Sequence, residues 1–284
     1  MGFGTLAHTF GCKPLVELAE EAGRSGIDFV QLALAKAIAD IDTSTGNLSP
    51  GLANHIGEQF DRNGVRIGVL GCYINPIEPD LALRRADIAR FKEHIRFARD
   101  FGTSIVATET GRPDIWKQQA GDRYSEVAWS VLRDTVSELA EEADRWGVTI
   151  GLEPVCVHTL ASPAHLHRLL EEVPSSTLGV VLDPCNLIYG SLELFEQRAA
   201  IIDSAFELLG DHIVLAHVKD LDISPDGKIS ETVIGHGSYD IASFIQRMNA
   251  RKPLIDMSIE ALKPETVAEA LAYARAAASG TVTV

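Results

Sequence analysis

The sequence predicts a (β/α)8 barrel, the TIM barrel fold, formed by residues 1–284 as one domain. Short apolar runs rich in β-branched residues recur eight times along the chain. Segments whose apolar residues lie three or four positions apart fill the intervals, and that spacing is typical of helices. No Pro/Gly/Ser-rich linker divides the chain, and a 46% hydrophobic composition supports one sizeable core.

The strand candidates are bounded by polar or turn-forming residues. In chain order they are residues 5–8, 27–32, 65–74, 104–109, 148–153, 178–183, 213–218 and 254–260. Helical periodicity is clearest in residues 18–23, 86–102, 131–147 and 264–278. A glycine precedes several strands, where we expect a helix to end in a left-handed cap: Gly26, Gly64, Gly102, Gly147 and Gly179. A doubly wound open sheet is the alternative, but no G-x-G-x-x-G follows the first strand.

The composition argues against several kinds of partner. The formal net charge of −15 would repel the phosphates of nucleic acids and the anionic surfaces of membranes. The apolar runs are strand-sized, well short of the roughly 18 residues that a membrane-spanning helix needs. The opening MGFGTLAHTF lacks the basic lead and apolar region of a signal peptide, so we expect a cytoplasmic protein. The four cysteines form no C-x-x-C pair, which favours reduced thiols.

Four of the apolar runs end in side chains that can bind a metal. They are Glu153 in GVTIGLEP, Asp183 in LGVVLDP, His217 in IVLAHVKD and Glu260 in LIDMSIEA. The carboxyl ends of barrel strands form the active face, so these side chains are expected to converge. Three gathered carboxylates repel one another unless a cation compensates their charge, and an imidazole adds a fourth ligand.

The sequence therefore predicts one bound divalent metal ion. An oxygen-rich set with one histidine favours Mn²⁺, Mg²⁺ or Co²⁺, although this donor set also admits Zn²⁺. The alternative is that each residue only caps a strand or forms a surface ion pair.

The series GLEP, VVLDPCNL, HVKD, IGHGSYD and SIEAL resembles the xylose isomerase-like barrels, in particular the sugar-phosphate isomerase/epimerase group that includes the ketose 3-epimerases. The resemblance covers nearly the whole chain. It implies that Glu153, Asp183, His217 and Glu260 hold the metal and that the two glutamates also form the acid/base pair. The sequence departs at Asn186, where tagatose-type epimerases have a histidine, and this affects a substrate contact. The superfamily also contains dehydratases, decarboxylases and endonucleases, so the resemblance does not identify the substrate.

Other side chains are candidates for substrate contacts, each with a structural alternative. His158, in the loop EPVCVHT, could contact the substrate or bond to a neighbouring backbone group. His8 closes the first expected strand and Glu109 the fourth, so both could reach the site from its opposite wall. Lys219 could hold a substrate oxygen or pair with Asp183 or Glu260.

Two more residues lie outside the strands. Trp116, in RPDIWKQQ, could form an apolar wall over a sugar or pack locally. In the glycine-rich stretch IGHGSYD we expect Asp240 to cap the next helix.

The sequence predicts a metal-dependent isomerase or epimerase of a ketose-like sugar or sugar phosphate. Glu153 and Glu260 would remove and return a carbon-bound proton through an enediolate. The first alternative is a lyase that expels water or carbon dioxide from a keto-polyol or keto-acid. A DNA-repair endonuclease conflicts with the acidic charge, and a non-catalytic sugar-binding barrel would bind no metal. The partner is thus a small-molecule sugar, and a homo-oligomer is compatible with the sequence.

Overall fold

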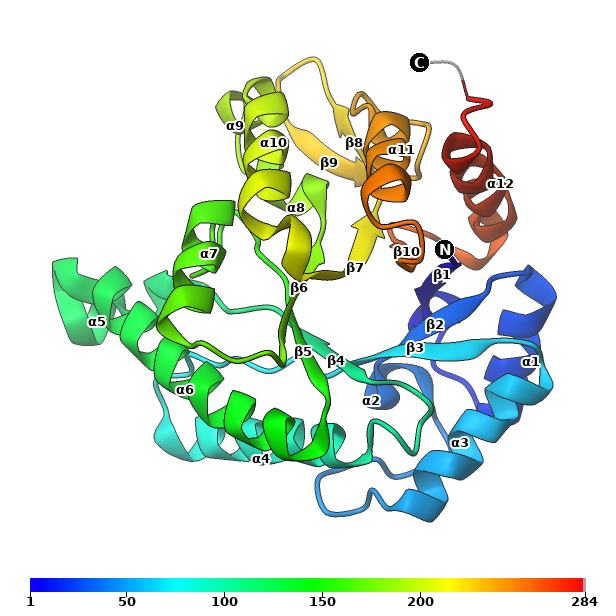
Figure 1. The fold of residues 1–284 in the computed structure, drawn as a ribbon, viewed down its shortest axis with the longest axis horizontal. Coiled ribbons are helices and arrows are strands. Elements are labelled where there is room, and N and C mark those ends of the chain that lie inside the picture. The colour runs from blue at the N-terminus through cyan, green and yellow to red at the C-terminus, as the bar shows by residue number, and fades with distance from the viewer. Residues whose placement is uncertain (283–284) are drawn as a thin grey trace.

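The strands close into a parallel barrel, as predicted (Figure 1). The computed structural model describes residues 1–282. The barrel strands are β1 (Phe3–Leu6), β2 (Phe29–Leu32), β3 (Arg66–Gly71), β4 (Ile105–Thr108), β5 (Thr149–Leu152), β6 (Leu178–Leu182), β7 (Ile213–Val218) and β10 (Met257–Ile259). They close in the order β1-β10-β7-β6-β5-β4-β3-β2, and each neighbouring pair is parallel. All carboxyl ends therefore meet at one mouth.

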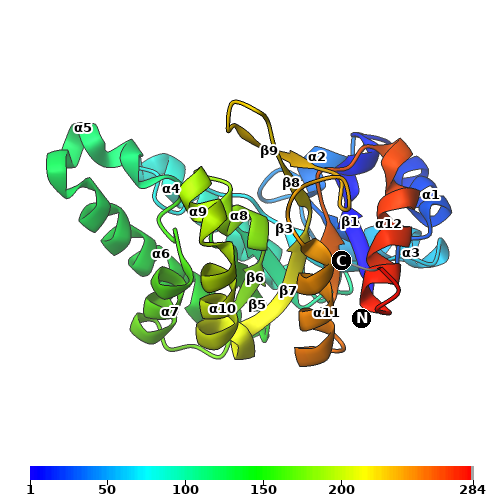
Figure 2. The ribbon, with the colours of Figure 1, turned by 90° about the horizontal axis from the view of Figure 1, so that it is seen from above.

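Helices surround the barrel (Figures 1 and 2). The longer ones are α1 (Leu15–Ser25), α3 (Pro50–Arg62), α4 (Leu81–Phe97), α6 (Tyr124–Trp146), α7 (Pro163–Glu172), α10 (Arg198–Leu209), α11 (Ile241–Arg251) and α12 (Val267–Ala278). Short segments in the loops are α2 (Leu34–Ala37), α5 (Lys117–Ala120), α8 (Pro184–Ile188), α9 (Leu192–Glu196), η1 (Ala7–Phe10), η2 (Pro113–Trp116), η3 (Gly121–Arg123), η4 (Gly210–His212) and η5 (Pro264–Thr266). Within residues 1–282, no helix has both the length and the apolar composition needed to cross a membrane.

Two local predictions are wrong. Gly179 does not cap a helix but lies inside β6, where an added Cβ would come within 2.8 Å of the Val214 side chain. The glycine is therefore explained by close packing between strands. His8 does not close β1, because the chain turns into η1 after Leu6 and the Gly11 amide donates to the His8 carbonyl.

A short hairpin after β7 was not predicted. β8 (Asp220–Ile223) pairs antiparallel with β9 (Ile229–Thr232), and Figure 2 shows the hairpin projecting beyond the barrel. Gly227, at a φ of 80°, supplies the left-handed residue of its turn. The hairpin brings Glu231 back towards the mouth of the barrel, where it pairs with Lys219.

The glycine-rich stretch after the hairpin wraps around one buried carboxylate, that of Asp220. Its Oδ2 accepts hydrogen bonds from the amides of Gly235 and Gly237, and its Oδ1 accepts from the amide of Tyr239. An added Cβ at Gly237 would lie only 2.3 Å from Asp220 Oδ1, so the backbone needs glycine to approach this closely. Asp240 caps α11, as predicted, by accepting from the Ser243 amide.

The barrel interior holds a small apolar core below its mouth. It consists of Phe29, Val69, Ala107, Val181 and Leu215. The ring of Phe29 fills space left by two glycines on the neighbouring strands: an added Cβ would lie 2.7 Å from this ring at Gly4 and 2.5 Å from it at Gly68. Leu215 lies two residues before His217, so side-chain alternation places His217 above this core.

Candidate metal centre and active site

The strand-end residues come together at the mouth of the barrel. Glu153 follows β5 directly, and Asp183 follows β6 and caps α8. His217 lies in β7 and Glu260 follows β10. Glu153, Asp183 and His217 are 5%, 0% and 1% exposed, so their charges have almost no contact with solvent.

The distances describe a compact cluster. The ligand atoms of Glu153, Asp183 and His217 all lie within 4.8 Å of one another. Glu260 joins the cluster through His217, whose Nδ1 is 3.1 Å from Glu260 Oε1 and 3.2 Å from Glu153 Oε1. The structure thus brings together the four residues that the sequence analysis singled out.

The cluster has the donor chemistry that a divalent cation requires. Asp183 Oδ1 accepts hydrogen bonds from the amides of Cys185 and Asn186, at 2.8 and 3.2 Å. Its buried Oδ2 makes no hydrogen bond within residues 1–282. Within residues 1–282 this oxygen pairs only with the Lys219 ammonium, 3.1 Å away, which leaves capacity for a second cation. Beside further carboxylate oxygens and an imidazole nitrogen, it fits a metal such as Mn²⁺ or Mg²⁺. Glu153, Asp183 and His217 could therefore bind a divalent metal.

Lys219 is a buried cation beside the same cluster. Its Nζ lies 3.1 Å from Asp183 Oδ2, 3.3 Å from Glu260 Oε2 and 2.7 Å from Glu231 Oε1. Burial opposes the charge, but these carboxylates hold the pKa of Lys219 well above its ordinary value. The ion pairs with Asp183 and Glu260 are those that the sequence suggested, whereas a substrate contact of Lys219 stays a prediction.

Burial and neighbouring charges shift the pKa values of the cluster. Burial disfavours the charged imidazole, but Glu260 and Glu153 raise the pKa of His217 to about 9. Burial also opposes ionisation of Glu153, yet His217, Lys219 and Asn186 lower its pKa. Burial raises the pKa of Asp183 in spite of Lys219. Since His217 must lose a proton to act as a ligand, we expect metal affinity to fall as the pH is lowered.

Asn186 binds a glutamate of the cluster. Its Nδ2 donates to Glu153 Oε1 at 2.7 Å, and the residue is buried. The amide at this position therefore fixes the orientation of Glu153 and lowers the pKa of its carboxyl group. A direct contact of Asn186 with a substrate stays a prediction.

A cavity of about 420 Å³ opens above the cluster and contains most of the other candidates. His8, Glu109, His158, Asn186 and Lys219 all line it. Trp116 is not among its lining residues: it lies in η2, and its Nε1 donates to the Ile77 carbonyl at 2.8 Å. The predicted contact of Trp116 with a sugar stays a prediction, and the position of Trp116 outside this cavity does not support it.

Glu109 and His158 lie near each other in the cavity wall. Glu109 Oε2 is 3.7 Å from His158 Nδ1. Burial, with added repulsion from Glu153 and Glu260, raises the pKa of Glu109 to about 7. Burial lowers the pKa of His158 and of His8. The cavity thus contains a carboxyl group that can exchange protons near neutral pH.

This shift predicts a pH-dependent gain in stability on replacing Glu109. Glu109 keeps its proton up to about pH 7 when folded but loses it from about pH 4.5 when unfolded, so its contribution to stability falls as the pH rises through that window. We therefore expect metal-free Glu109→Gln to melt at a higher temperature than the wild type at pH 8 and at a similar temperature at pH 5. Thermal unfolding in a chelator tests this. Glu265→Gln, at an exposed position, is the control, and an equal change at both pH values would contradict the prediction.

Sequence analysis missed several residues of the cavity. Lys36, Tyr73, Tyr189 and Glu231 line it, and Gln31 lies beneath it in contact with His217. The sequence could have indicated Gln31, because it is the one polar residue in the buried strand FVQL. Lys36, Tyr189 and Glu231 come from loop segments or from the unpredicted hairpin, where no strand pattern points to the site. Tyr73 falls within the strand predicted at residues 65–74 but lies beyond the end of β3 at Gly71.

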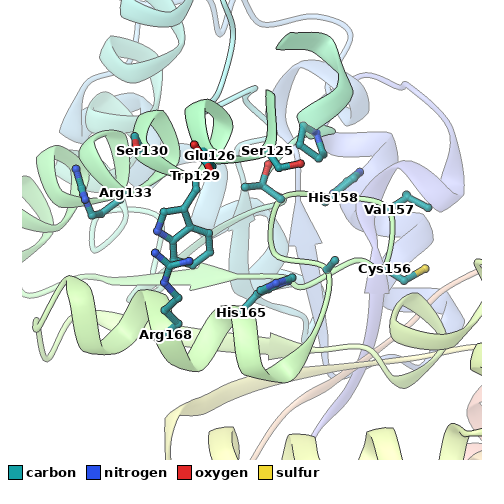
Figure 3. Close-up of a pocket in the computed structure, with 13 residues that line it drawn as sticks. Ser125, Glu126, Trp129, Ser130, Arg133, Cys156, Val157, His158, His165 and Arg168 are labelled. Carbon is teal, nitrogen blue, oxygen red and sulfur yellow. The ribbon is translucent and has the colours of Figure 1, made fainter. Parts of the chain in front are cut away.

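A second cavity, of about 530 Å³, lies between α6 and α7 (Figure 3). His158 lines both this cavity and the one above the cluster. In the outer cavity the Arg168 guanidinium stacks over the Trp129 ring at 4.0 Å and pairs with Glu172, which also accepts from Trp129 Nε1. Arg168 and Trp129 in the wall of the outer cavity therefore already bind each other and Glu172.

Comparisons with known proteins agree with this architecture. A D-tagatose 3-epimerase-like protein superposes with a TM-score of 0.78 at 18% identity, covering 99% of this chain and 98% of that one. An IolI protein with a bound zinc atom gives 0.73 at 18% identity and full coverage of both chains. The probable 3-DHS dehydratase AsbF from Bacillus anthracis gives 0.70 at 14% identity, covering 97% and 98%. At such identities the likeness shows a shared fold.

No curated protein matches the sequence significantly. The sequence model of the xylose isomerase-like TIM barrel family, however, matches residues 16–277, which is most of the chain. The chain therefore belongs to the xylose isomerase-like TIM barrel family.

Proposed function

We propose that the protein is a divalent-metal-dependent isomerase or epimerase of a ketose-like sugar or sugar phosphate. The observation that carries the proposal is the placement of two glutamates around one imidazole nitrogen. Glu153 and Glu260 both lie within 3.2 Å of His217 Nδ1. Their strands, β5 and β10, lie on opposite sides of the β6–β7 pair in the barrel order, so the two carboxylates approach from different directions.

A divalent metal in this cluster would polarise a substrate carbonyl and stabilise the negative charge that develops on its oxygen. Glu153, Asp183, His217 and Glu260 would hold it. Mn²⁺ is the ion we expect, and Mg²⁺, Co²⁺ and Zn²⁺ also suit the donors.

The protein's own groups would then move the proton. Glu153, held by Asn186 and ionised because of its lowered pKa, is suited to accept a proton from the carbon next to the carbonyl. Glu260, beside Lys219, can return a proton from the other side. Return to the same carbon gives epimerisation, and return to the neighbouring carbon gives aldose-ketose isomerisation. Glu153 and Glu260 both line the cavity, so a proton held by either can exchange with water before it is returned.

A lyase is the second candidate, because a further group can act as an acid. Glu109, whose pKa is raised to about 7, lines the same cavity and could protonate a leaving hydroxyl group. The fold shared with a probable dehydratase supports this alternative. Both reactions begin with the same proton abstraction. The lyase then releases water or carbon dioxide, whereas the isomerase or epimerase returns the proton to the substrate.

Incubation of the Mn²⁺-loaded protein with a panel of ketoses and ketose phosphates in deuterated water tests the proposal. We expect an accepted substrate to gain deuterium next to its carbonyl and to yield an isomer of otherwise equal mass. A product lighter by water or carbon dioxide would favour the lyase. Substrates that bind without exchange or mass change would exclude proton abstraction at this site.

Metal stoichiometry tests the centre itself. We expect one divalent ion per chain after dialysis and its loss from the double variant Asp183→Ala/His217→Ala, because two of the ligands are removed together. Elemental analysis measures the ion, and circular dichroism checks the fold. The double variant His167→Ala/Asp203→Ala, at surface positions, is the matched control. Full metal content in the Asp183/His217 variant would place the metal elsewhere.

A further inference from the structure

The buried amide of Gln31 reaches across the barrel mouth to a proposed metal ligand. Gln31 lies in β2, which is separated from β7 by β1 and β10 in the barrel order. The residue is only 1% exposed, as is His217. Its Oε1 lies 2.9 Å from His217 Nε2, on the opposite edge of the ring from Nδ1.

The other end of the amide is also bound. Gln31 Nε2 donates to the Tyr73 hydroxyl at 2.9 Å. With the amide nitrogen bound to Tyr73, the carbonyl oxygen at the other end of the amide faces His217. Tyr73 itself packs over Gly71, where an added Cβ would meet its ring at 3.1 Å. Gln31 is thus held between His217 and Tyr73, which lies just after β3.

The orientation of the amide selects one tautomer of the imidazole. In the neutral imidazole, an acceptor at Nε2 keeps the proton on Nε2, so the proton that is lost on metal binding is the one on Nδ1. Nδ1 is the nitrogen that faces Glu153 and Glu260. A reversed amide would present its N–H to Nε2 and would favour the tautomer with its proton on Nδ1.

We infer that Gln31, held in place by Tyr73, is a positioning residue that makes Nδ1 of His217 the metal-binding nitrogen. The inference rests on the metal centre of the proposed function. Partners that bind the second nitrogen of a ligand histidine fix its ring and tautomer, and their loss typically costs about 10–100-fold in metal affinity. Gln31 would have this role from the opposite side of the barrel, without touching the metal or the substrate.

Calorimetric titration with Mn²⁺ tests the inference. We expect Gln31→Leu to weaken binding by about 10–100-fold, because the ring loses its acceptor. Gln31→Glu should bind within a few-fold of the wild type, since a carboxylate can accept from both the imidazole N–H and the Tyr73 hydroxyl. Thr135→Val is the control, because it removes one buried side-chain hydrogen bond, to the Pro76 carbonyl, on α6. It should lose stability without losing affinity.

A second measurement needs only the wild type and so does not depend on the folding of a variant. Long-range ¹⁵N–¹H spectra of the histidine rings in the Zn²⁺-loaded protein distinguish ligation through Nδ1 from ligation through Nε2. We expect a metal-bound Nδ1 and a protonated Nε2 in His217.

The outcomes separate the inference from the function on which it rests. Ligation through Nε2, or a folded Gln31→Leu protein that binds Mn²⁺ like the wild type, would overturn the role of Gln31 and leave the metal centre standing. A wild type that binds neither Mn²⁺ nor Zn²⁺ would overturn both.

Discussion

Glu153→Gln and Glu260→Gln are each expected to lower the turnover of an accepted ketose by about 10²–10⁴-fold, the range for a missing acid/base group. An amide keeps the shape of the side chain but cannot accept the substrate proton. Steady-state rates at saturating Mn²⁺, with the metal content of each variant measured, separate this loss from the loss of a ligand. Glu265→Gln, five residues beyond Glu260 and exposed, is the matched control.

Deuterium exchange adds a more specific expectation. If Glu153 and Glu260 serve different faces of the substrate, a variant that retains one base can exchange the proton on that face without forming the epimer. Both exchange and turnover should therefore be recorded for each variant. Full turnover in either variant with its metal bound would exclude that glutamate from the proton transfer.

Lys219→Met is expected to destabilise the metal-free protein by about 3–5 kcal/mol at pH 8, the cost of leaving a buried charge without its partner. The Lys219 side chain is 4% exposed, and its ammonium group pairs with the fully buried carboxylate of Asp183. Added Mn²⁺ should restore part of the loss, because a cation bound in the cluster would again compensate the carboxylates.

Urea unfolding with a chelator and with Mn²⁺ measures both effects. Lys228→Met, at an exposed lysine of the hairpin, is the control and should change stability little in either condition. A metal-free Lys219→Met protein as stable as the wild type would indicate that the carboxylates hold protons and need no internal cation.

The main features of the candidate site could be predicted because they depend on local rules. A parallel barrel gathers the carboxyl ends of its strands, so Glu153, Asp183, His217 and Glu260 could be placed together from their positions after apolar runs. Lys219 could be placed beside them by strand alternation. These inferences needed only the strand pattern and the closure of the sheet.

The residues that were missed depend on tertiary contacts. Glu231 reaches Lys219 only because the β8–β9 hairpin folds back, and the exposed polar stretch that forms it has no strong strand pattern. Lys36 enters the cavity from the short α2, outside any strand. His8 was placed on β1 because the start of a 3₁₀ turn is hard to distinguish from the end of a strand in sequence.

Because Phe29 fills the barrel interior, the residues at positions 4, 29 and 68 are expected to change together among relatives. The ring lies where side chains at Gly4 and Gly68 would otherwise stand, so an alanine at either glycine conflicts with the phenylalanine. A smaller residue at position 29 would leave a void that those alanines could occupy. Relatives should therefore tend to keep either one aromatic with two glycines or a smaller residue with larger neighbours. Residues 4, 29 and 68 lie directly beneath Gln31 and His217. Substitutions at these three positions are therefore restricted to combinations that keep the packing under the candidate metal site.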